Sequence, residues 1–74
     1  MKASKEIAID AIEKVVLEIM SYSVRVDGYK IKPYGKDLVK LTIFDPYGNI
    51  VDTTKGTPYY VLCVAKSWLY PLLR

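Results

Sequence analysis

The sequence predicts one α+β domain, in which an N-terminal and a C-terminal helix pack on one face of an antiparallel sheet of three or four strands. Three observations lead to this fold class. A length of 74 residues fits a single domain, residues 1–74. Apolar residues recur with helical spacing near both ends and alternate in between. Turn signals at 27–28, 33–35 and 45–48 divide the alternating part. The expected order is α-β-β-β-α or α-β-β-β-β-α.

The first helix is expected over residues 5–20. Ser4 can cap it, and Glu6 places a negative charge in the first turn, where the helix dipole favours it. The charged side chains fall on one half of the helical wheel, and we expect them to face water. The core half is formed by apolar residues: Ala8, Ile9, Ala11, Ile12, Val15, Val16, Ile19 and Met20.

Strands are expected near 22–26, 29–33, 38–44 and 49–53. Asp27-Gly28 favours a tight hairpin turn, which gives four strands. The same pair also fits a bulge within one long first strand, which gives three. The segment 38–44 has the clearest strand pattern, and Asp45-Pro46-Tyr47-Gly48 forms a strong turn after it.

The last helix is expected from Pro58 to about residue 70 or slightly beyond, with Thr57 as its cap and Pro71 bending or ending it. Its core face comprises Val61, Leu62, Ala65, Trp68, Leu69, Leu72 and Leu73. The opposite face is aromatic and nearly uncharged, with Lys66 at its flank. That composition predicts an interface with a second copy or another protein partner, unless the tyrosines cover their own domain. The predicted interface residues are Tyr59, Tyr60, Cys63, Val64, Ser67 and Tyr70.

The side chains that carry most enzyme chemistry are absent. The chain has no histidine, and Cys63 is its only cysteine, which argues against a catalytic triad, an internal disulfide and a zinc site. The glycines form neither a phosphate-binding loop nor a dinucleotide fingerprint. We therefore expect a non-enzymatic protein without metal or cofactor.

The expected location is the cytoplasm. Met1-Lys2-Ala3-Ser4 leads into a charged helix and not into an apolar leader. No apolar run reaches the roughly 18 residues that a membrane span requires. A composition without glutamine or histidine and with a single asparagine is typical of proteins from thermophiles.

A basic stretch gives a second functional hypothesis. The formal net charge is +3, and residues 22–40 carry an excess of positive charge with tyrosines interleaved. Such a stretch suits phosphate contacts and base stacking, although it also fits an ordinary solvated sheet face. The nucleic acid could be RNA or DNA. The candidate binding residues are Arg25, Lys30, Lys32, Lys36 and Lys40.

The strand at 40–44, the turn at Gly48, the strand at 49–53 and Gly56 before the last helix resemble the layout of the double-stranded RNA-binding domain. The resemblance covers most of the chain and implies a helix, antiparallel strands and a second helix. That family opens its second helix with a lysine cluster, whereas the matching stretch here is Thr57-Pro58-Tyr59-Tyr60-Val61. No RNA-binding residue is therefore carried over.

Two functions follow from these observations. The first is a small interaction module that self-associates or docks through its last helix. The alternative is a nucleic-acid-binding accessory protein that uses the basic strands.

Overall fold

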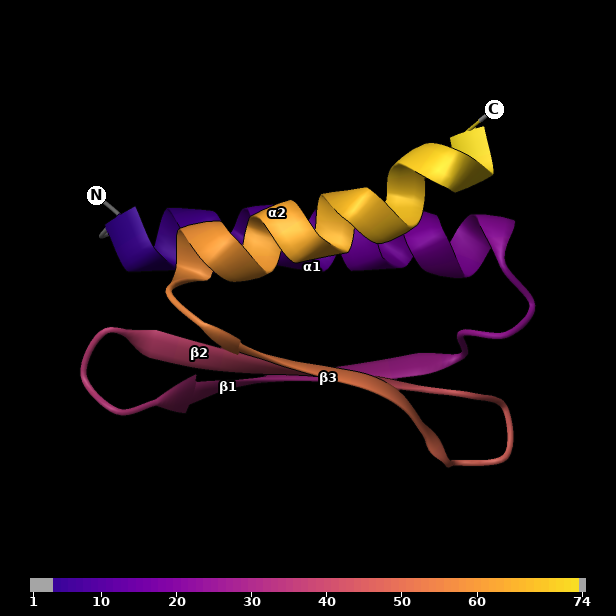
Figure 1. Cartoon of the computed structure of the whole chain (residues 1–74), viewed down its shortest axis with the longest axis horizontal. Coiled ribbons are helices and arrows are strands. Elements are labelled where there is room, and N and C mark those ends of the chain that lie inside the picture. The colour runs from indigo at the N-terminus through magenta and orange to yellow at the C-terminus, as the bar shows by residue number, and fades with distance from the viewer. Residues whose placement is uncertain (1–3, 74) are drawn as a thin grey trace.

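The computed structural model describes residues 4–73 and shows two layers (Figure 1). Helices α1 (Ser4–Tyr22) and α2 (Pro58–Leu69) lie side by side on one face of a three-stranded sheet, and the 3-10 turn η1 (Tyr70–Leu73) follows α2. The strands are β1 (Gly28–Tyr34), β2 (Leu38–Phe44) and β3 (Ile50–Gly56). The predicted α+β class, with both helices on one face, is confirmed.

The sheet is an antiparallel meander with β2 in the centre. Successive side chains of a strand point to opposite faces, so alternate residues of β2 face the helices. Those residues are Val39, Leu41 and Ile43, and all three are buried. The core is completed by buried side chains from the α1–β1 connection and both helices: Ile12, Val16, Ile19, Val26, Val61, Ala65 and Leu69.

The predicted turn between β2 and β3 is present. The Oδ1 atom of Asp45 accepts hydrogen bonds from the backbone N–H groups of Tyr47, at 2.9 Å, and Asn49, at 2.8 Å. Gly48 adopts a φ of 84°, which glycine tolerates better than any other residue. The pairing of β2 with β3 then shifts by one residue at Ile43/Phe44, as in a β-bulge.

The strand expected at 22–26 does not form, and the four-strand alternative is wrong. Helix α1 continues to Tyr22, and the N–H of Ser23 still bonds the carbonyl of Ile19 at 2.9 Å. The alternating valines of this segment have different roles, because Val24 is 91% exposed and Val26 is buried in the core. Asp27-Gly28 is neither a hairpin turn nor a bulge within one long first strand, because β1 begins at Gly28. The N–H of Asp27 bonds the carbonyl of Phe44 and extends the β1–β2 ladder.

The end of α2 also differs from the expected core face. Thr57 caps the helix as predicted, since its Oγ1 atom accepts from the N–H of Tyr60 at 3.2 Å. The α-helix ends at Leu69, and Pro71 lies in the tighter turn that follows, where side chains point in new directions. Leu72 and Leu73 are therefore exposed, although the helical wheel assigned both to the core.

Candidate functional site

Both helices of residues 4–73 lie on the same face of the sheet, so no helix of this part of the chain covers the other face. We call this surface the open face. It consists of the strand residues that alternate with the core-facing ones, placed by the pairing of the strands. They are Lys30, Lys32 and Tyr34 of β1, Leu38, Lys40, Thr42 and Phe44 of β2, and Ile50, Thr53 and Lys55 of β3.

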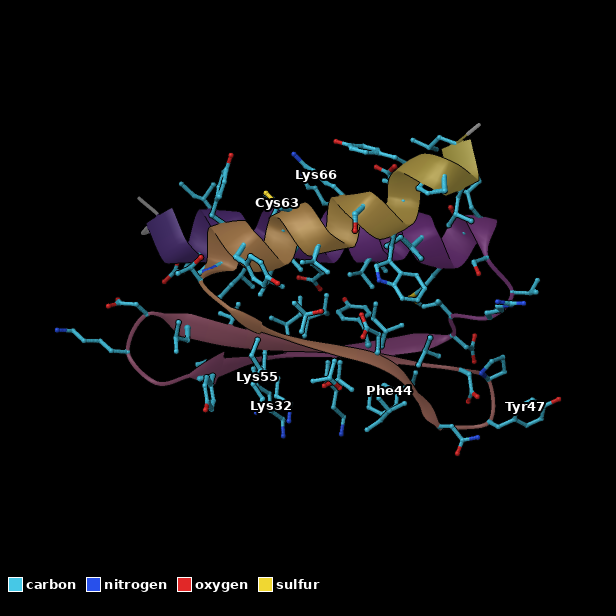
Figure 2. All side chains as sticks on the ribbon, viewed as in Figure 1. Lys32, Phe44, Tyr47, Lys55, Cys63 and Lys66 are labelled. Carbon is cyan, nitrogen blue, oxygen red and sulfur yellow. The ribbon has the colours of Figure 1, made fainter. Side chains whose placement is uncertain are left out.

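Three lysines form a row across the open face. Lys32 pairs directly with Lys40, and Lys40 pairs directly with Lys55. Neighbouring strands lie about 4.8 Å apart, so three positive side chains start from adjacent positions on one line. Figure 2 shows Lys32 and Lys55 pointing away from the helices. This row is an electrostatically costly arrangement, because like charges directly opposite each other destabilise a sheet.

No acidic side chain of the strands offsets this charge. Asp52 is the one acidic residue within β1, β2 and β3, and it pairs with Ile43 on the side that faces the helices. The strand residues of the open face therefore carry four lysines and no carboxylate. Such a surface attracts an anion with several charges more strongly than a single small ion.

Two aromatic rings flank the lysine row along the strands. Phe44 lies toward one end of the open face, and Tyr34 lies at the other. The Nζ atom of Lys30 is 5.8 Å from the centroid of the Phe44 ring, and that of Lys55 is 5.2 Å from the centroid of Tyr34. Because β2 separates Lys55 from Tyr34, the Lys55 side chain must lie flat across the sheet. Thr42, at the centre of the face, is buried.

The structure brings together only part of the predicted basic set. Lys30, Lys32 and Lys40 share the open face, whereas Arg25 lies in the α1–β1 connection and Lys36 in the β1–β2 turn, at opposite ends of the sheet. Sequence analysis missed Lys55 and Phe44. Lys55 lies far along the chain from the basic stretch, and only the cross-strand pairing places it beside Lys40.

The predicted interface residues of α2 lie mostly on the surface. Tyr59, Cys63, Ser67 and Tyr70 are exposed, and Figure 2 shows Cys63 and Lys66 pointing away from the sheet. Tyr60 is exposed as well, but it also packs on its own domain. Its ring lies so close to Gly56 that a Cβ atom added to this glycine would be 2.7 Å from the ring. Val64 is half-buried. This face is therefore accessible to a partner in the single chain.

Tyr29 links the sheet to α1 on the helix side. Its hydroxyl donates a hydrogen bond to Oε1 of Glu13 at 2.7 Å. This hydrogen bond to the carboxylate, followed by partial burial and the negative charge of Glu13, raises the pKa of Tyr29 above its usual 10.0. The folded state therefore favours the protonated phenol.

Replacing Tyr29 with phenylalanine is expected to lower the free energy of unfolding by about 0.5–1.5 kcal/mol near neutral pH, because one hydrogen bond is lost. A raised pKa gives a contribution that is complete below the usual pKa and disappears as the pH rises through the folded-state pKa. Denaturant unfolding at pH 7 and above pH 10 measures both effects. An equal difference between the two proteins at both pH values would contradict this linkage.

Within residues 4–73, neither helix has the combination of length and apolar character that crossing a membrane requires. No model of a known protein family, no curated protein and no solved structure matches the chain. The order of helix, three antiparallel strands and helix is compatible with the layout of the double-stranded RNA-binding domain at the level of topology. Function must therefore be inferred from the geometry of the two exposed surfaces.

Proposed function

We propose that this chain is a non-enzymatic module that binds nucleic acid, RNA or DNA, through its open face. The row of Lys32, Lys40 and Lys55 carries the proposal. Lysines placed opposite one another without a strand carboxylate on the same face cost stability in the free protein. A phosphate backbone offers several negative charges on one chain, so it can neutralise the row and release its own counterions.

The rings beside the row favour nucleic acid over a simple polyanion. In the free protein, the ammonium groups of Lys30 and Lys55 lie over the rings of Phe44 and Tyr34. An exposed cation–π contact contributes about 0.5–1 kcal/mol. A base stacked on an aromatic ring contributes about 1–3 kcal/mol. Moving each lysine to a phosphate while a base takes its place on the ring is therefore favourable.

Fluorescence anisotropy with labelled oligonucleotides tests this proposal. Single strands and duplexes of both RNA and DNA are titrated with the protein at low salt and at several higher salt concentrations. If three or four lysines contact phosphates, a plot of log affinity against log salt should fall with a slope of about −2 to −4. A Lys66→Gln variant, altered on α2 and away from the open face, serves as the control and should bind like the unmodified protein. Absence of binding to all four oligonucleotides at low salt would exclude the proposal.

A second candidate function is self-association through the outer face of α2. Tyr59 and Tyr70 are 75% and 54% exposed, and the small residues Cys63 and Ser67 lie between them. Small residues allow two helices to approach closely, and a two-fold axis lets one patch serve both copies. This face lies in the helical layer, away from the open face (Figure 1), so a dimer would keep both sheets accessible. Light scattering should then give twice the chain mass of 8.4 kDa.

A further inference from the structure

We propose that the nucleic acid bound by the open face is single-stranded, and that two of its bases stack on Phe44 and Tyr34. This inference rests on the proposed function and goes further, because it names the ligand class and the residues that select it. The lysine row alone would serve a duplex or a single strand equally well. The position of the two rings distinguishes the two ligands.

The rings lie on the same face as the lysines, at either side of the row. Tyr34 pairs with Leu38, and Leu38 and Phe44 are six positions apart along β2. At about 3.3 Å per residue, the two rings are therefore about 20 Å apart along the strands. The lysine row and Lys30 lie between them. A flexible strand can place one base on each ring while the intervening phosphates meet the lysines.

A duplex cannot use these rings, because its base faces are covered by neighbouring base pairs. The strands of the open face also offer no projecting element that could enter a groove, since the two strand connections lie at the ends of the sheet (Figure 1). Single-stranded ligands have accessible base faces, and stacking depends little on base identity. The open face should therefore prefer single strands and show weak sequence preference.

The surroundings of Phe44 keep one side of its ring accessible. Gly28 of β1 pairs with Phe44 and has no side chain to lie against the ring. A Cβ atom at position 28 would lie 3.8 Å from the Cβ atom of Phe44, an ordinary contact, and Gly28 does not have a positive φ. A larger residue is therefore tolerated by the backbone and would shield the ring. A substitution at Gly28 can therefore block the ring of Phe44 without removing it.

The test compares a single-stranded oligonucleotide of about 12 nucleotides with a duplex of the same length, by anisotropy on the full chain. The unmodified protein should bind the single strand at least tenfold more tightly. Phe44→Leu should weaken single-strand binding by about 5- to 150-fold, the range for loss of one stacked base. Gly28→Val should also weaken single-strand binding, although Phe44 is still present. Neither change should alter the salt slope or duplex affinity, because both leave the lysines in place.

Tyr47→Leu is the matched control. Tyr47 is an exposed aromatic residue in the β2–β3 turn, beyond the open face (Figure 2), and its loss should leave binding unchanged. Thermal melting of each variant verifies that it is folded. Equal affinity for single strand and duplex, or unchanged binding by both Phe44→Leu and Gly28→Val, overturns this inference and leaves the proposed function intact. Failure of every oligonucleotide to bind removes the proposed function and this inference with it.

Discussion

Replacing Lys32, Lys40 and Lys55 together with threonine is expected to weaken nucleic-acid binding at least about a hundredfold. Each lysine supplies a charge-assisted contact of about 1 kcal/mol or more, and 1.4 kcal/mol corresponds to a tenfold change in affinity. The salt slope should become shallower by about two units, because three phosphate contacts are lost. Anisotropy titrations at several salt concentrations measure both quantities.

The same triple substitution is expected to stabilise the fold. It removes two directly opposed lysine pairs and introduces a residue that favours strands. Relief of the two opposed pairs should raise the free energy of unfolding by about 0.5–1.5 kcal/mol, less roughly 0.5 kcal/mol for the Lys55–Tyr34 contact that is lost. For a domain of this size, 1 kcal/mol raises the melting temperature by about 4–8 °C, which calorimetry resolves. Lys66→Gln should change neither property appreciably. A triple variant that still binds tightly would show that the row is only a solvated surface.

Placing glutamate at both Tyr59 and Cys63 is expected to convert a dimer into a monomer of 8.4 kDa. Both side chains are exposed in the single chain, so the substitutions should leave its core intact. In a dimer joined by this face, they would bury carboxylates without partners, at a cost of several kcal/mol. Tyr60 and Val64 are less suitable positions, because Tyr60 packs on Gly56 and Val64 is half-buried.

Val24→Glu is the control for this experiment, because Val24 is a highly exposed apolar residue away from α2. The Val24→Glu variant should have the same light-scattering mass as the unmodified protein. If Cys63 lies near the two-fold axis, mild oxidation of the unmodified protein should also trap a disulfide-linked dimer. An unmodified protein that already scatters light as 8.4 kDa at micromolar concentration contradicts self-association through α2.

The parts of the fold that local sequence determines could be predicted. The caps and apolar periods of both helices, the strand pattern of 38–44 and the turn at Asp45 depend on neighbouring residues only. The strand predicted around Val24 and Val26 was wrong, because a short alternating pattern fits a strand or a loop equally well. In the structure, α1 continues to Tyr22, and the residues after it form the connection to β1.

The open face was harder to predict because it depends on cross-strand register. The pairing of Phe44 with Ile50, continued without a shift, would pair Lys40 with Thr54 and turn Lys55 toward the helices. The bulge moves the register by one residue and places Lys55 on the open face instead. Nothing in the composition of β3 indicates that shift. The sequence therefore indicated three of the four lysines and, among the interleaved tyrosines, Tyr34, but neither the lysine row nor Phe44.

The contact between α1 and α2 joins the beginning of the described chain to its end (Figure 1). Helix α1 and the strands precede α2 in the chain, and the strand meander can pair through local hairpins before α2 is in place. The apolar face of α1, including Ile12 and Val16, still lacks α2 at that stage. An intermediate that lacks α2 exposes this apolar surface and is prone to aggregate. Docking of α2 against α1 therefore closes the core and covers this surface.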